Sequence, residues 1–306
     1  MSFLADRSPI FRDMFLIPQP PPSTATTEAD SVAPRVVELP DCTEDVYDLL
    51  RVLVPAGAAS RPFSSHIIPT FDTISACIRL GHKCQIDDIV EAGVGYLRDF
   101  FPRSLDAYRE IVSPAGPPAF ERVHAIGVVN LARLTGASEV LPTAIMKCAS
   151  LPGSQLIAGF RRRDGTHETL SEHDLALCVD AQRALMREHV WHAIELSAPF
   201  DNANCVDRAR GSSSGTRLCV HVAKLVAAER AGEATAANVF EERDWPREGA
   251  GDPGVGARGG GSRLCASCVE VLRRMEARCM QDTWNRLPEI VGVPLKGWGR
   301  KSLEGV

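Results

Sequence analysis

Apolar residues recur at helical spacing along most of this sequence, and that spacing restricts the fold classes open to the chain. In the opening segment Phe11, Met14 and Phe15 stand at i, i+3 and i+4, so they share one helical face. Ser8 and Pro9 precede them as an N-cap and first-turn pair. The same spacing returns at Val46, Leu49, Leu50 and Leu53, and at Phe71, Ile74, Cys77 and Ile78. A predominantly helical chain is therefore predicted.

Two segments of the first hundred residues carry a family resemblance. Residues 4–15 contain a Leu-Ala pair, then Ser, Phe and a terminal Met-Phe, and residues 80–86 read Leu-Gly-His-Lys-Cys-Gln-Ile. Between them, residues 36–41 alternate like a short strand and end in Pro-Asp. In this order the segments resemble the BTB/POZ family, and in particular its mushroom-type fungal members. Gly81 and Cys84 stand where that fungal version usually has Ala and Tyr.

The resemblance implies an α+β fold for residues 1–102, in which a small sheet packs on helices. A complete member of the family carries two strands and a turn before the Leu-Ala helix, and the sequence given has no residues for them. We therefore predict an N-terminally truncated BTB/POZ-like domain. An incomplete sheet would leave unpaired strand edges and exposed apolar surface, which favour partner binding or aggregation.

Three breaks in composition divide the chain. Residues 18–31 begin with a proline-rich run and are predicted to be a loop inserted into the BTB/POZ-like domain. The run Ser-Pro-Ala-Gly-Pro-Pro at 113–118 precedes a mainly helical stretch. Seven glycines within residues 249–261 predict a flexible linker, because this segment lacks the Lys-Ser/Thr ending of a phosphate-binding loop.

Two further units are predicted after residue 102. Residues 103–200 are assigned to a helical extension, with a short hairpin near 156–170 around an Asp-Gly turn. In that extension Gly136 is expected to end one helix, and Ser171 with Asp174 to begin a long one as a capping box. Residues 201–306 are assigned to a cysteine-containing helical region that includes the glycine-rich linker.

Composition limits the classes of partner. Lys and Arg number 34 against 39 Asp and Glu, and the net charge of -5 offers no basic field for nucleic acid. The dense basic run at 161–163 is interpreted as a solvated loop. No stretch suits a membrane helix, and charges near the N-terminus interrupt any signal-peptide core. Ten cysteines without such a signal are expected to be mostly reduced, so we predict an intracellular protein of cytoplasm or nucleus.

The cysteine spacing suggests a metal site. Cys265 and Cys268 have the two-residue separation with which two thiolates bind one tetrahedral zinc ion. Cys205, with Cys219 or His221, could supply the other ligands. Four protein ligands leave no position for water, so such a zinc would be structural. The alternative is that the two CxxC cysteines are small apolar residues on one helix.

Other candidates for chemistry are few. His189 and His192 lie three residues apart beside Glu188, which is not the spacing of a zinc-protease motif. We interpret them as a partly exposed pair on a helix surface. A redox role for the CxxC would need a thioredoxin-like βαβ pattern, which the sequence does not show. No catalytic residue and no cofactor other than the structural zinc are predicted, and we expect the protein not to be an enzyme.

The BTB/POZ resemblance implies protein–protein interaction. Partners implied by the family are a second copy of the chain or a cullin-3 ubiquitin ligase, for which the chain would be a substrate adaptor. The residues carried over as interaction candidates are those of the family-matching helix, Ser8, Phe11, Met14 and Phe15. The alternatives are a transcriptional or chromatin-associated BTB scaffold and, more remotely, an enzyme that uses the CxxC cysteines.

Overall fold

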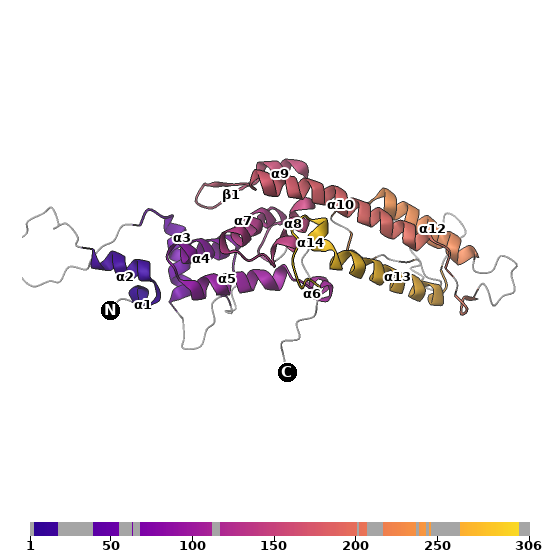
Figure 1. Cartoon of the computed structure of the whole chain (residues 1–306), viewed down its shortest axis with the longest axis horizontal. Helices are drawn as coiled ribbons and strands as arrows, with labels where there is room; N and C mark the ends of the chain where they lie inside the picture. The colour runs from indigo at the N-terminus through magenta and orange to yellow at the C-terminus, as the bar shows by residue number, and fades with distance from the viewer. Residues whose placement is uncertain are drawn as a thin grey trace, which may run out of the picture.

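The molecule is elongated and built mostly of helices, as the computed structural model of the chain shows in Figure 1. The structure describes residues 3–17, 39–54, 63, 68–111, 117–200, 202–206, 217–236, 239–242, 245 and 264–299. The described helices are α1 (Phe3–Arg7), α2 (Pro9–Leu16), α3 (Thr43–Leu53), α4 (Phe71–Lys83), α5 (Asp87–Phe100), α6 (Leu105–Glu110), η1 (Arg122–His124), α7 (Ala125–Thr135), α8 (Leu141–Ala149), α9 (Gly153–Ala158), α10 (Glu172–Ser197), α12 (Arg217–Gly232), α13 (Ala266–Asn285) and α14 (Leu287–Ile290). The prediction of a predominantly helical chain is confirmed.

A single short hairpin supplies the strands of the described part of the chain, so the small sheet expected for residues 1–102 is not found among the described residues of that range. The strands β1 (Phe160–Arg161) and β2 (His167–Glu168) pair antiparallel, with Phe160 opposite Glu168. The predicted hairpin is therefore present but shorter than residues 156–170, because residues up to Ala158 belong to α9. Residues 39–41 form no strand, and the rest of the predicted strand at 36–41 lies outside the described residues, as do the segments 18–31 and 249–261.

Several helices begin and end where side-chain chemistry predicts. The Ser8 Oγ accepts a hydrogen bond from the Phe11 amide at 3.0 Å, and Pro9 occupies the first turn of α2. The Ser171 Oγ accepts from the Asp174 amide at 3.1 Å and starts α10. Gly136 ends α7 with φ of 70°, a left-handed conformation that glycine adopts without a steric penalty.

Three apolar cores follow one another along the molecule. The N-terminal core lies among α2, α3, α4 and α5. Its buried residues are Phe11, Leu49, Leu53, Cys77, Leu80, Cys84, Ile86 and Ile89. The distal core lies at the opposite end, among α10, α12 and α13. Its buried residues are Ala193, Leu196, Cys205, Cys219, Val222, Ala223, Ala227, Trp245, Leu264, Cys265, Cys268, Val269 and Leu272.

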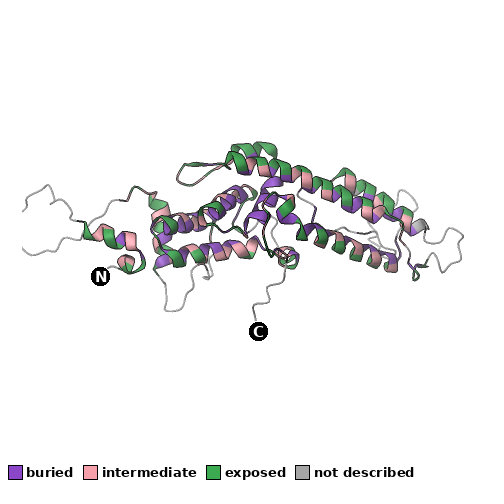
Figure 2. Ribbon diagram, in the orientation of Figure 1, coloured by how far each residue is buried: buried purple, intermediate pink, exposed green. Residues whose placement is uncertain are grey.

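The largest, central core surrounds α8, which is buried along its whole length. Figure 2 shows buried residues concentrated where α7, α8 and α14 meet, whereas the outer face of α10 is largely exposed. Phe71, Leu131 and Trp284 belong to this core, so each of the three units predicted from sequence contributes to it. Gly127 permits the packing of α4 on α7, because a Cβ there would lie 2.1 Å from the Phe71 ring. The unit boundaries at 102 and 200 stay a prediction.

None of the described helices combines the length and the apolar character needed to cross a membrane.

Candidate functional site

The two segments that carry the family resemblance contact each other. The Ser8 Oγ, at the start of α2, donates a hydrogen bond to the Cys84 carbonyl at 2.6 Å, although 76 residues separate them. The Ser8 side chain therefore has two partners, since it also caps α2. Ser8 is 0% and Phe11 5% exposed, and Phe11 packs into the N-terminal core. This contact fixes α2 against the end of α4.

The family-matching residues divide into an inner and an outer set. Ser8 and Phe11 are buried inside the molecule, whereas Met14 and Phe15 are half-buried. Leu16 and Ile17, at the end of α2, are 72% and 58% exposed. The family resemblance did not include these two residues among the interaction candidates. Their position, an apolar pair directly after the family segment, could have indicated them. The most exposed apolar side chains at this helix therefore lie at its C-terminal end.

Substitution Ser8→Ala tests the contact between α2 and α4. We expect hydrogen exchange of the α2 amides to accelerate about tenfold, since loss of the cap and of the donor to Cys84 costs about 1–2 kcal/mol. The matched control is Ser104→Ala, because the Ser104 Oγ caps α6 through the Ala107 amide at 3.2 Å. If the α2 amides of Ser8→Ala exchange at the wild-type rate, the Ser8 contact does not hold this helix in place.

Four buried cysteines form the second site, in the distal core. The Sγ atoms of Cys205, Cys219, Cys265 and Cys268 all lie within 4.8 Å of one another. Cys205 is 3.9 Å from both Cys219 and Cys265, and none of these side chains is more than 3% exposed. All four are free thiols. The four residues predicted as zinc ligands are thus brought together, whereas the alternative ligand His221 is exposed on α12 and outside this group.

Polar groups surround the sulfur atoms. The Asn202 Nδ2 donates to the Cys268 Sγ at 3.3 Å and also to the Ser267 Oγ at 3.0 Å. Burial raises the pKa of the Cys265 thiol, but hydrogen bonds with the backbone of Val206 and Cys268 outweigh burial, so that this pKa is lowered from its usual value. Burial raises the pKa of the neighbouring Cys268 thiol to about 12.

The histidine pair was predicted to be partly exposed, and this prediction is wrong. His189 is 4% and His192 1% exposed, because α13 covers this face of α10. The His192 Nε2 and Thr283 Oγ1 lie 2.8 Å apart, and Thr283 in turn donates to Glu188 at 3.2 Å. These contacts join α10 to α13, which gives His192 a structural role.

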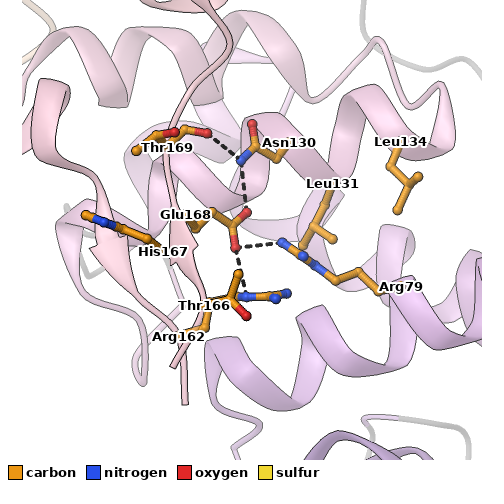
Figure 3. A pocket seen from close by; sticks show the side chains of 9 residues that line it. All are labelled: Arg79, Asn130, Leu131, Leu134, Arg162, Thr166, His167, Glu168 and Thr169. Carbon is orange, nitrogen blue, oxygen red and sulfur yellow. Dashed lines mark hydrogen bonds and ion pairs between the residues drawn. The ribbon is translucent and has the colours of Figure 1, made fainter. Parts of the chain in front are cut away.

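A third polar cluster connects the hairpin to the helices that it covers (Figure 3). The Glu168 carboxylate accepts from the Arg79 Nη2 at 2.6 Å and from the Asn130 Nδ2 at 2.9 Å, and the Arg162 Nε lies 3.7 Å away. The prediction of a solvated arginine run is wrong for Arg162, whose side chain is only 13% exposed. Because Glu168 is occupied by these partners, the cluster holds β2 against α4 and α7.

Comparison with known proteins identifies no relative: no protein-family model, no curated protein and no solved structure matches the chain. The residues and their geometry therefore carry the functional argument.

Proposed function

We propose that this chain is a non-catalytic protein-interaction protein of the BTB/POZ type that binds partners through its N-terminal helices. The hydrogen bond between Ser8 and Cys84 is the observation that carries this proposal. It joins the two segments on which the family resemblance depends, and both contribute to the N-terminal core.

Exposed apolar side chains at this end of the molecule supply the contact surface. Besides Leu16 and Ile17, Phe3, Tyr47 and Val54 are between 42% and 63% exposed. Burial of large apolar side chains of this kind is a main source of binding energy in protein interfaces. The proposed partner is a second copy of the chain, a protein such as cullin-3, for which the chain would act as a ubiquitin ligase adaptor, or both.

Two other functions have less support from the described residues. A transcriptional or chromatin-associated scaffold would share the N-terminal interaction, but the described residues add no observation that favours it. An enzyme would need its reactive groups within reach of a substrate. The CxxC cysteines and the histidine pair are buried in helix packing, which favours structural roles for them.

Self-association tests the proposed contact surface. We expect light scattering after gel filtration to show a dimer that dissociates in the double variant Leu16→Asp/Ile17→Asp, because burying two carboxylates without partners opposes association. The matched control is Ile157→Asp on α9, since Ile157 is 69% exposed but lies away from α2. The control should remain a dimer.

The same variants separate the two kinds of partner. A wild-type chain that is monomeric but captures recombinant cullin-3, with capture lost in the double variant, supports the adaptor function alone. Self-association without cullin-3 capture removes the adaptor function and leaves the homodimer. A monomeric chain that fails to capture cullin-3, or a double variant that behaves like the wild type, would overturn the proposed role of this surface.

A further inference from the structure

We propose that Cys205, Cys219, Cys265 and Cys268 bind one zinc ion, which holds the distal core together. This site lies at the opposite end of the molecule from the N-terminal helices. The inference goes beyond the proposed protein interaction and does not depend on it.

The size of the cysteine group fits one metal ion. In a tetrahedral site with Zn–S bonds of about 2.3 Å, the sulfur atoms lie about 3.8 Å apart. The two Sγ distances from Cys205, to Cys219 and to Cys265, are both 3.9 Å, and no Sγ pair exceeds 4.8 Å. The group therefore needs only a small contraction to enclose a zinc ion. An iron–sulfur cluster would spread its thiolates farther apart, because they bind different iron atoms.

The donor set selects the kind of metal and its role. Four thiolates are soft ligands, and a tetrahedral all-sulfur site is typical of structural zinc. Binding of Zn²⁺ would release the thiol protons to solvent and leave a centre with a charge of −2. Since four protein ligands fill the coordination sphere, no position remains for a water molecule or substrate. The proposed ion is therefore structural.

Hydrogen-bond donors near the sulfurs provide an independent observation. Asn202 is only 6% exposed, and its Nδ2 reaches the Cys268 Sγ at 3.3 Å. Its Oδ1 accepts from the Asn204 amide at 3.0 Å, which fixes the side chain in the turn that leads to Cys205. A buried amide held against sulfur offsets the negative charge of a thiolate centre. Cys265 is the N-cap residue of α13, and Cys268 lies in the first turn of this helix.

Small side chains make up much of the distal core. Four cysteines and three alanines account for seven of its thirteen buried residues, beside larger apolar side chains such as Leu196, Trp245 and Leu272. Small cores of this kind are commonly stabilised by disulfides or structural metals. The four ligands come from the turn after α10, from α12 and from the start of α13. One ion would therefore connect three segments of the chain.

Metal analysis of the purified, reduced full chain tests the inference. We expect about one zinc per chain in the wild type and nearly none in Cys268→Ser or Cys219→Ser, because three thiolates hold zinc less tightly than four. The matched control is Cys279→Ser, since Cys279 lies on the same helix, α13, but outside the group. The control should keep its zinc.

A second measurement covers the case in which the variants fail to fold. Wild-type protein stripped of metal and titrated with Co²⁺ should develop the visible absorption of a tetrahedral cobalt–thiolate centre, saturating at about one ion per chain. Much less than one zinc per chain combined with no cobalt spectrum, or full zinc retention in the cluster variants, would overturn the proposal. Bound iron in place of zinc would also overturn the proposal of a zinc site.

Discussion

Removal of the metal from the purified chain is expected to unfold the distal core and leave the central core intact. After treatment with a chelator, amide protection should be lost in α12, around Cys205 and in the first turns of α13. Protection of α4, α7 and α8 should not change. Hydrogen exchange followed by mass spectrometry measures both regions in one experiment.

The expected effect is large because the proposed ion would join three segments of the chain within the distal core. Structural zinc in small domains contributes an apparent binding free energy of about 10 kcal/mol or more, which is comparable with the stability of a whole domain. The central core has its own large buried side chains, among them Phe71 and Trp284, and contains none of the four ligands. Both α10 and α13 extend from the central core into the distal core, so only their distal ends should open.

The control for this experiment is the Cys268→Ser variant. The amides of its distal core should already exchange rapidly, and adding the chelator should not accelerate their exchange further. Equal protection of α12 in the wild-type chain with and without chelator would show that packing alone holds the distal core.

Glu168→Ala is expected to lower the free energy of unfolding by about 3 kcal/mol, since it leaves two partly buried cations without their shared partner. The Glu168 side chain is 4% exposed, and the side chains of Arg79 and Arg162 are 30% and 13% exposed. Without the carboxylate, two positive charges would face each other under the hairpin (Figure 3). The expected loss of stability is at the lower end of the range for broken buried ion pairs, because Asp164 still pairs with Arg162 at 2.7 Å.

Urea unfolding measures this difference, and Glu270→Ala provides the comparison. Glu270 pairs with Arg274 at 3.1 Å one helical turn away, with side chains 56% and 73% exposed. Loss of such a surface pair should change the free energy by less than about 0.5 kcal/mol. If the two variants were equally stable, Glu168 would not be the anchor of the hairpin.

Local features of the fold could be predicted from the sequence because they depend on neighbouring residues. Ser8 and Ser171 cap helices through amides three residues ahead, and Gly136 ends α7 with its own backbone conformation. The turn at Gly165, with φ of 81°, likewise needs no distant partner. The helical character of the chain follows from the same short-range spacing.

Burial depends on distant segments, and here sequence reasoning failed. His189 and His192 belong to a helix whose pattern does not show that α13 will cover them. Arg162 was interpreted as solvated because basic runs usually are, but its guanidinium pairs with Asp164 at 2.7 Å and lies 3.7 Å from Glu168. Arg79 of α4 binds the same Glu168 carboxylate, and the spacing of the basic run does not encode that contact.

Short-range patterns predicted the helical class of this protein, several of its helix ends and the pair of thiols in the CxxC motif, since each needs only residues a turn or less apart. Helix packing joins two further cysteines to that pair. The Cys205 Sγ lies 3.9 Å from the Cys265 Sγ, 60 residues away, because α10, α12 and α13 meet in the distal core. Helix packing likewise brings Ser8 to Cys84. Contacts over such separations depend on how whole helices pack, and short-range spacing does not encode that packing.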